Sequence, residues 1–223
     1  MSVVSKWINR LQNIGKRQSF GLNRLDWKLE KYVDFNRGFF IEAGANNGIK
    51  QSNTLYFEKY RKWRGLLIEP VPELAAQCKK NRPHCIVEHA ALVPCDYSQK
   101  EIEMRYCDLM SQVKGAMKST EDEVAHIRRG CEVQNIESRP VVAPARTLGS
   151  IIERHNIEHI DLLSLDVEGY ELQVLQGLDL SRHKPLFILV EARFRSEIHD
   201  RLQSHYRVHA ELSHHDILYR RHY

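Results

Sequence analysis

The chain has 223 residues, of which 33 are basic and 29 acidic, and its formal net charge at pH 7 is +4. Hydrophobic residues make up 42% and charged residues 28%, which is typical of a soluble globular protein and excludes a collagen-like or largely disordered chain. No apolar run approaches the roughly 18 residues of a membrane span, and the charge excess is too small to indicate nucleic-acid binding by itself.

The first 37 residues carry the basic excess and are expected to form a helical extension, followed by one domain over 38–223. Apolar residues from Val4 to Ile14 recur at helical spacing, with basic residues off that stripe. Such a helix usually packs on its domain, although a basic amphipathic helix can also lie on an anionic membrane. We therefore expect packing and keep a weak membrane-surface contact through residues 1–20 as the alternative.

Beyond this extension, short apolar runs alternate with segments of helical pattern. Strands are expected at 39–43, 65–69, 84–93, 160–166 and 185–191, and helices at 53–62, 72–81, 147–155, 170–178 and 194–204. A short antiparallel addition is expected at 102–106, and a terminal hairpin at 206–212 with 217–220. Residues 108–136 show no clear period and are expected to form a lid or an inserted binding loop.

This alternation of apolar strands with helices predicts an α/β domain with a mostly parallel sheet covered by helices on both faces. The terminal hairpin would make the sheet mixed. Ligands of such sheets bind beyond the carboxyl ends of the strands. The residues that end the strands are therefore the candidates for a functional site.

The first expected strand ends in Glu42 and runs into the turn Gly44–Gly48. This G-x-x-x-G spacing differs from the dinucleotide-binding G-x-G-x-x-G, and no Walker-type G-x-x-x-x-G-K-[ST] is present. A carboxylate before the turn would repel a pyrophosphate, whereas it suits a cationic ligand. Glu69 ends the second strand, where an acid can hold the hydroxyls of a ribose. Together these residues indicate a nucleoside whose other end is positive, a description that S-adenosylmethionine fits.

The fourth strand ends in Asp166-Val167-Glu168-Gly169 and the fifth ends in Glu191. Two close carboxylates can move a proton, because their repulsion raises one pKa, or they can bind a divalent cation such as Mg²⁺. Asp166 is the first candidate for a catalytic base or metal ligand, Glu191 is the second, and Glu168 is a further catalytic candidate. Alternatively, Asp166 or Glu168 caps the helix that begins near Tyr170.

Three segments carry a resemblance to a known family. They are "FFIEAGANNGIKQSNTLYFE" from Phe39, "WRGLLIEP" from Trp63 and "DLLSLDVEGYELQVLQG" from Asp161. In this combination and order they resemble the FkbM family of S-adenosylmethionine-dependent methyltransferases, over roughly Leu22 to Arg221.

The resemblance implies the class I methyltransferase Rossmann-like fold, a seven-stranded mostly parallel sheet in the order 3-2-1-4-5-7-6 with an antiparallel seventh strand. The implied methyltransferase domain covers 38–223, and the implied reaction methylates a hydroxyl of a sugar or of another small-molecule or glycoside acceptor. The cofactor-binding residues assigned in this way are Glu42, Gly44, Asn46, Gly48, Asn53, Glu69, Pro70, Ala90, Ala91 and Asp166.

Two positions depart from the family pattern. Thr147-Leu148-Gly149-Ser150-Ile151 stands where many relatives have "TLDSL", and little effect on catalysis is expected because this position opens a helix. Glu191-Ala192-Arg193 stands where many relatives carry a histidine soon after the fifth strand, so no histidine base is expected at that point. Arg128, Arg129 and Arg193 would either recognise an acidic acceptor or remain solvated charges.

Two other functions stay open at this point. A nucleic-acid methyltransferase resembling this fold would carry [DNS]-P-P-[YFW] after the fourth strand, where this chain has Asp166-Val167-Glu168-Gly169, so no nucleic-acid partner is expected. A catalytically silent module that binds S-adenosylmethionine is the other alternative, and the acids at the four strand ends argue against it.

The cysteines bear on the compartment. They are odd in number, and they form no C-x-x-C pair that would indicate a zinc site or a disulfide framework: Cys78, Cys85, Cys95, Cys107 and Cys131. The first 20 residues lack the continuous apolar stretch of a secretory signal. Free thiols in a reducing cytoplasm are therefore expected.

Overall fold

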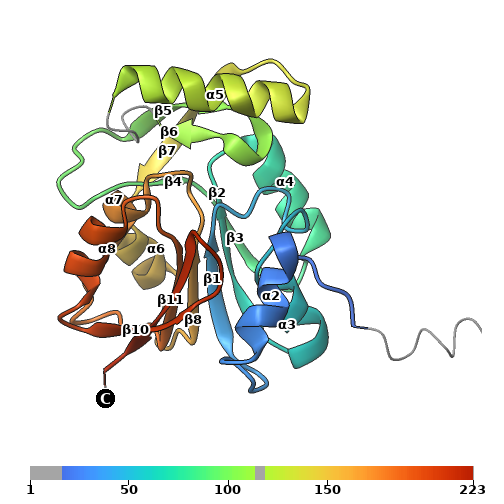
Figure 1. Ribbon diagram of the computed structural model, residues 1–223, viewed down its shortest axis with the longest axis vertical. Coiled ribbons are helices and arrows are strands. Elements are labelled where there is room, and N and C mark those ends of the chain that lie inside the picture. Colours follow the sequence, from blue (N-terminus) through green and yellow to red (C-terminus); the bar gives the residue numbers. More distant parts are fainter. Residues whose placement is uncertain (1–16, 114–118, 223) are drawn as a thin grey trace, which may run out of the picture.

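The computed structural model of the protein describes residues 17–113 and 119–222. A large sheet stands between layers of helices, and a smaller sheet crossed by a long helix lies beyond one end of it (Figure 1). We call the second unit, residues 91–146, the insertion. Within the described ranges, no helix is both long and apolar enough to cross a membrane.

The large sheet has seven strands, in the order β3 (Ile86–His89), β2 (Arg64–Glu69), β1 (Phe39–Ala43), β8 (Leu162–Leu165), β9 (Phe187–Glu191), β11 (Asp216–Arg221) and β10 (Tyr206–Glu211). Counted along the chain, these are strands 3-2-1-4-5-7-6 of the sheet. All pairs from β3 to β9 are parallel, whereas β11 runs antiparallel to both β9 and β10. The predicted α/β class is confirmed, and the sheet is mixed.

Side chains that alternate along the strands build an apolar core on each face of the large sheet. Ile41 and its neighbours on one face pack under α6 (Leu148–Arg154), α7 (Glu171–Gln176) and α8 (Arg195–Leu202). Phe40 and its neighbours on the opposite face pack under α2 (Leu25–Glu30), α3 (Leu55–Arg61) and α4 (Pro72–Asn81). Because both faces are buried, the central strands read as continuous apolar runs.

The N-terminal segment is described from Arg17 onward. Residues 1–16, which carry most of the predicted basic amphipathic helix, lie outside the described residues. The chain then forms a 3₁₀ turn, η1 (Leu22–Arg24), and helix α2, whose Leu25 and Leu29 are buried in the core. This part of the segment is helical and packed, whereas a membrane contact through residues 1–20 stays a prediction.

The insertion contains a four-stranded sheet, in the order β4 (Ala91–Leu92), β7 (Arg139–Arg146), β5 (Glu101–Tyr106) and β6 (Gln112–Val113). The single strand predicted over 84–93 is wrong, because the chain divides there: β3 joins the large sheet and β4 pairs with β7. The sequence does not predict β7, since Pro140 and Pro144 argue against a strand. One edge of β7 pairs with β5 along the whole length of β5. On its other edge, among the described ranges, only the last two residues of β7 are paired, with β4. Proline is tolerated along such a mostly unpaired edge.

Helix α5 (Thr120–Gln134) occupies part of the segment that shows no period in the sequence. Ser119 caps its first turn by accepting a hydrogen bond from a backbone N–H. Within this helix His126 is buried, whereas Val124 and Val133 are exposed. These two valines therefore do not mark the packed side, and the sequence shows no clear helical period here.

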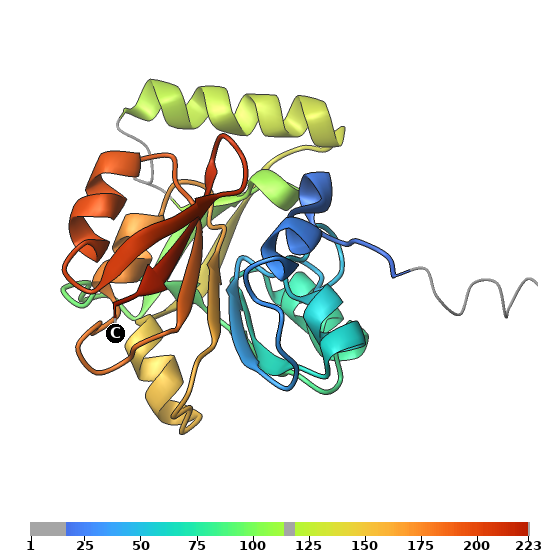
Figure 2. The ribbon, with the colours of Figure 1, turned by 60° about the horizontal axis from the view of Figure 1, so that its bottom comes forward.

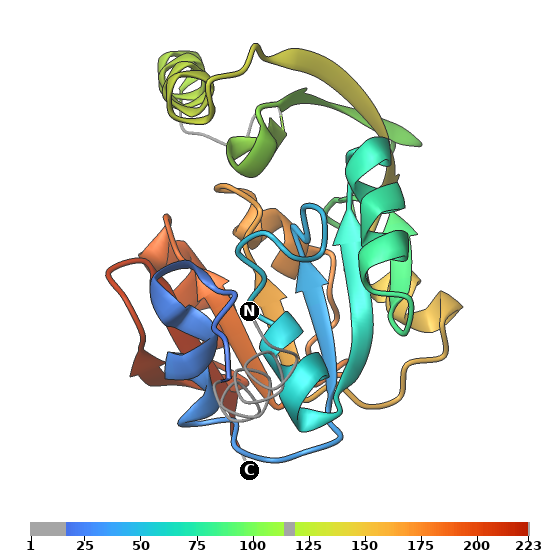
Figure 3. The ribbon, with the colours of Figure 1, turned by 90° about the vertical axis from the view of Figure 1, so that its right-hand side faces the viewer.

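The insertion covers the end of the large sheet toward which β1 points. In Figure 3 the arrow of β1 is directed at η2 (Asp108–Met110) and α5, and Figure 2 shows α5 across the same end from another side. Gly130 lets α5 approach η2 closely, because a Cβ there would meet the Sγ of Cys107 at 2.8 Å. The Sγ atoms of Cys107 and Cys131 lie 3.3 Å apart as free thiols.

Candidate functional site

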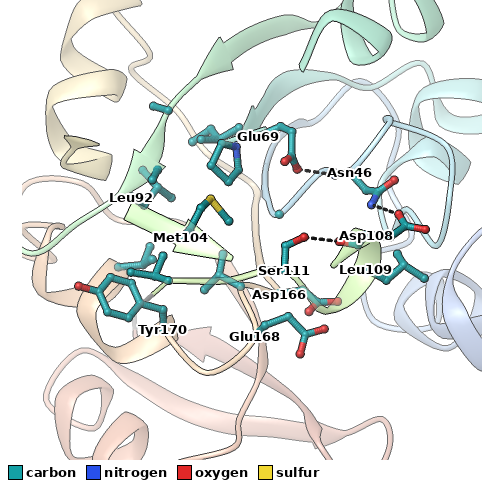
Figure 4. A pocket seen from close by; sticks show the side chains of 18 of the residues that line it. Asn46, Glu69, Leu92, Met104, Asp108, Leu109, Ser111, Asp166, Glu168 and Tyr170 are labelled. Atoms are coloured by element: carbon teal, nitrogen blue, oxygen red, sulfur yellow. Dashed lines mark hydrogen bonds between the residues drawn. The ribbon is translucent and has the colours of Figure 1, made fainter. Parts of the chain in front are cut away.

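A pocket opens at the carboxyl ends of β1, β2 and β8, between the large sheet and the insertion (Figure 4). About 830 Å³ of space lies between the protein atoms around it, including its open mouth. The insertion contributes part of the wall through Met104, Asp108, Leu109, Ser111 and Val113. The pocket therefore lies at the edge where α/β sheets bind ligands.

The pocket brings together seven of the ten residues assigned to the cofactor by resemblance: Gly44, Asn46, Glu69, Pro70, Ala90, Ala91 and Asp166. Glu42, Gly48 and Asn53 do not line it. Leu92, Met104 and Tyr170 form an apolar side of the pocket, and polar side chains lie on the opposite side (Figure 4).

Gly44 allows two strand ends to meet. Its φ is +84°, and a Cβ at this position would lie 1.8 Å from the backbone carbonyl oxygen of Asp166. Glycine is the residue that tolerates both the positive φ and this close approach. The end of β8 can therefore place Asp166 directly beside the turn that follows β1.

Glu69 holds that turn against the end of β2. Its carboxylate accepts hydrogen bonds from the backbone N–H groups of Asn46 at 2.8 Å and Val71 at 2.9 Å. Burial raises the pKa of Glu69 to about 8, although these two hydrogen bonds lower it. Glu69 thus presents a fixed, buried carboxyl group to the pocket.

Glu42 does not line the pocket, and its pairing with a cationic ligand stays a prediction. Its carboxylate accepts hydrogen bonds from the Oγ of Ser52 at 2.9 Å, the backbone N–H of Asn53 at 2.8 Å and the Oγ1 of Thr54 at 2.6 Å. All three residues belong to the turn before α3. Glu42 lies on the α2–α4 face of the sheet, where this turn uses its oxygens.

Gly48 and Asn53 also do not line the pocket, and each forms hydrogen bonds within the fold. Arg82, whose side chain is fully buried, donates from Nη1 to the carbonyl oxygen of Gly48 at 2.9 Å and forms an ion pair with Glu58. The Nδ2 of Asn53 donates to the Oγ of Ser164 at 3.4 Å. These residues stabilise the loop that carries Asn46 and do not face the ligand space.

The carboxylates of Asp166, Glu168 and Glu191 gather at the ends of β8 and β9, with oxygen atoms within 4.8 Å of one another. Asp166 and Glu168 line the pocket, whereas Glu191 does not. Burial and then repulsion by Glu191 raise the pKa of Glu168 to about 8. Desolvation, followed by repulsion from Glu191 and Glu168, raises the pKa of Asp166 well above its ordinary value. Because Asp166 is open to the pocket, repulsion is the cause that the geometry supports best.

Neither Asp166 nor Glu168 caps α7, so the capping alternative is wrong. The residue before this helix is Tyr170, which forms no side-chain cap. Glu171 instead accepts hydrogen bonds from the backbone N–H groups of Val167 and Gly169, both at 3.0 Å. Glu171 therefore shapes the loop after β8 and leaves the two preceding acids available to the pocket.

Two further residues join the acidic cluster. The Nη2 of Arg193 donates to Glu168 at 2.6 Å, and the Nε2 of His126 lies 3.5 Å from the same carboxylate. Sequence reasoning missed His126, because it comes from α5 and lies 67 residues before Arg193. A histidine thus reaches this site from the insertion and not from the loop after β9.

The insertion also contacts the turn after β1. Asp108 accepts hydrogen bonds from the Nδ2 of Asn46 at 3.0 Å and the Nζ of Lys50 at 2.5 Å. Lys50 donates in addition to Gln134 at the end of α5, at 3.2 Å. None of these contacts is marked by a motif, because the partners are far apart in the sequence.

Arg128 and Arg129 do not line the pocket. Both are exposed on α5, and the Nε of Arg128 lies 3.6 Å from Glu132 one turn further on. Their expected alternative role as solvated charge fits this position. Arg193, in contrast, is engaged by the acids of the cluster, which leaves it no free charge for an acidic acceptor.

Comparison with known proteins places this site in a family context. The model of the methyltransferase FkbM domain matches residues 42–219 of the chain, a range that includes every acid of the pocket. No curated protein matches the chain.

Two solved structures are similar to the chain. Methyltransferase FkbM from Methylobacillus flagellatus KT is 16% identical with a TM-score of 0.47, and the match covers 82% of this chain and 43% of that one. This chain therefore spans less than half the length of that relative. A TehB-like SAM-dependent methyltransferase from Corynebacterium glutamicum ATCC 13032 Kitasato is 10% identical with a TM-score of 0.44, over 98% of this chain and 96% of that one.

Proposed function

This chain belongs to the methyltransferase FkbM domain family, and on that premise we propose that it transfers a methyl group from S-adenosylmethionine to a hydroxyl of a sugar or of another small-molecule or glycoside acceptor. The observation that carries the proposal is the pocket in which Glu69 and Asp166 face one space, at the ends of the two parallel strands β2 and β8 that flank β1. A buried acid after β2 suits a ribose, and acids after β8 suit the positive end of the same ligand.

The residues present fit this cofactor in three places. Glu69 is buried, is fixed by two backbone donors and retains acceptor capacity toward the pocket. The small side chains of Ala90 and Ala91 together with Leu92 leave an apolar slot of the kind that receives a flat base. Gly44 lets the backbone approach a ligand closely.

When bound, S-adenosylmethionine supplies an electrophilic methyl group on a positively charged sulfur. Asp166 takes the proton of the acceptor hydroxyl, because it faces the pocket and no ion pair of its carboxylate is found among the described residues. Its raised pKa suits a base, since a carboxyl with a higher proton affinity accepts a proton more readily. Residues of the insertion form part of the pocket wall.

As the alternative to a direct base, we propose that Asp166 and Glu191 hold Mg²⁺, because carboxylate oxygens are the ligands this ion prefers. The oxygen atoms of the acidic cluster are close enough to share one cation. Arg193 limits the affinity, because its guanidinium already neutralises Glu168 and lies 3.7 Å from Glu191. Weak calorimetric binding of MgCl₂ that Asp166→Asn abolishes is the expected result, and binding unchanged in that variant would remove the proposed ligand.

The compartment and the acceptor complete the proposal. All five cysteines are free, and we place the protein in the reducing cytoplasm on that account. The acids at the acceptor end of the pocket favour a neutral or cationic hydroxyl compound over nucleic acid, whose phosphates they would repel.

Calorimetric titration with S-adenosylmethionine and S-adenosylhomocysteine tests the cofactor. We expect micromolar binding by the wild type and a loss of roughly 1–3 kcal/mol in Glu69→Ala, because a buried hydrogen-bonding carboxyl group is removed. Glu73→Ala, on the exposed side of α4, is the matched control and should bind normally. No binding of either ligand by the wild type would refute the proposed function.

A further inference from the structure

Arg193 lies next to the acidic cluster, on the loop between β9 and α8. Its Nη2 donates to Glu168 at 2.6 Å, and its Nε lies 3.7 Å from the Oε2 of Glu191. The side chain is 30% exposed, so it lies at the rim of the cluster and not in a core. One guanidinium therefore serves two of the three carboxylates, and Asp166 is the one without such a partner among the described residues.

The same guanidinium also meets the insertion. Its Nη1 lies 3.4 Å from the Nδ1 of His126, and the Nε2 on the other side of that ring lies 3.5 Å from Glu168. The side chain of His126 is only 6% exposed, and its Nε2 has no hydrogen-bond partner among the residues that the structure describes. A buried ring nitrogen without a hydrogen-bond partner lowers the stability of the fold. The nearby carboxylate of Glu168 limits this loss only while Arg193 keeps it in place.

We propose that Arg193 is a positioning residue, which holds Glu168 and Glu191 in one network with His126 of α5 and so leaves Asp166 as the carboxylate presented to the pocket. This inference rests on the proposed function, because it gives Asp166 the role of base. It adds a residue that acts through others and a physical link between α5 and the site. When Arg193 is lost, both the acidic cluster and the packing of α5 should change.

The electrostatics agree with this geometry. Arg193 lowers the pKa of Glu168 by its charge and its hydrogen bond, against burial and the repulsion from Glu191. Burial, and then the charge of Arg193, lower the pKa of His126, so this ring is held neutral beside the guanidinium. The other charged groups that face this network are Asp166 and Glu171 on the β8 side, Asp216 on β11 and Arg129 on α5.

NMR of the His126 ring nitrogens at one fixed pH, with the histidines labelled by ¹⁵N, tests the proposal without an acceptor. The Nδ1 of His126 lies beside the Nη1 of Arg193, and its Nε2 faces Glu168. We expect the chemical shifts of both nitrogens to change in Arg193→Met, and Arg193→Lys to restore part of the difference. Arg195→Met is the matched control, because Arg195 pairs with Glu211 away from the pocket and should leave both shifts unchanged.

Hydrogen exchange of the α5 amides is the second measurement, because a role confined to local folding of the β9–α8 loop would not change it. Exchange should speed up in Arg193→Met and remain at the wild-type rate in Arg195→Met. His126 ring-nitrogen shifts unchanged in folded Arg193→Met, or α5 exchange at the wild-type rate, would overturn the inference. Failure of the wild type to bind S-adenosylmethionine would refute the proposed function instead, and leave these two measurements intact.

Discussion

The large sheet and the insertion meet at one pocket, but different forces hold them. Both faces of the sheet are packed with apolar side chains from every central strand. The insertion has a smaller apolar cluster, and it reaches the turn after β1 and the acidic cluster through polar contacts of Asp108, Gln112 and His126. Partly exposed polar contacts contribute less than apolar burial. The insertion should therefore open locally while the sheet stays folded.

Substituting one glycine directly after β1 of the large sheet and one in the insertion should give the largest difference in the loss of unfolding free energy. In Gly44→Ala the new Cβ would overlap the Asp166 carbonyl at a positive φ, so we expect a loss of about 3 kcal/mol or more of unfolding free energy. In Gly130→Ala the new Cβ meets side-chain atoms of Cys107 and Met110, which can shift together with α5. Thermal unfolding measures both changes, and equal losses would contradict the contrast between the two regions.

Asp166 tests the chemistry on the sheet side. Asp166→Asn should slow methyl transfer to a hydroxyl acceptor by at least about 10²-fold, the usual contribution of a general base. The wild-type rate should rise with pH, since the raised pKa of Asp166 keeps it protonated at low pH. The measurement is the formation of S-adenosylhomocysteine from S-adenosylmethionine in the presence of glycoside acceptors, with the exposed Asp179→Asn as control. Full activity in Asp166→Asn would exclude this residue as the base.

Glu69 tests the buried charge at the end of β2 through the pH dependence of stability. The pKa of this carboxyl is raised in the folded protein to about 8, so the folded state binds the proton more tightly than the unfolded state. Its contribution to stability is complete below pH ~4.5 and is lost as pH rises to about 8. In Glu69→Gln we expect a flatter dependence over this window by about 1 kcal/mol or more, measured by urea unfolding. Parallel curves for the two proteins would contradict it.

Lys50 tests the polar attachment of the insertion, where the smallest effect is expected. Lys50→Met removes the contacts with Asp108 and Gln134, so amides of η2 and α5 should exchange faster while those of β1 and β8 do not change. Affinity for S-adenosylhomocysteine should fall only a few-fold, since a partly exposed ion pair contributes about 0.2–1 kcal/mol. Lys79→Met, at an exposed position of α4, is the control.

The same contrast explains how much the sequence predicts. Central strands such as β1 and β8 are buried on both faces, and their continuous apolar residues predict them directly. In the insertion, β7 contains two prolines, and α5 packs through His126 and Gly130 while its valines face solvent. Neither element has the pattern that its structure normally produces, because its packing is set by tertiary neighbours.

The site divides in the same way. Glu69 and Asp166 end strands, and the topology of a parallel sheet alone brings such residues together. Glu42 also ends a strand, yet the turn before α3 uses its carboxylate, and only the hydrogen bonds reveal this. His126 and Arg193 meet through the docking of α5, a contact between distant segments that no local spacing encodes.

The path of the insertion has a consequence for engineering. It leaves and rejoins the rest of the chain at adjoining points, because Ala91 pairs with Ala145 and Leu92 with Arg146. Its two ends therefore lie one strand spacing apart, about 4.8 Å. A segment whose ends lie this close can be replaced as a unit. A substitute of another length and sequence has to keep only the two residue pairs at its ends in order to join the domain of the large sheet.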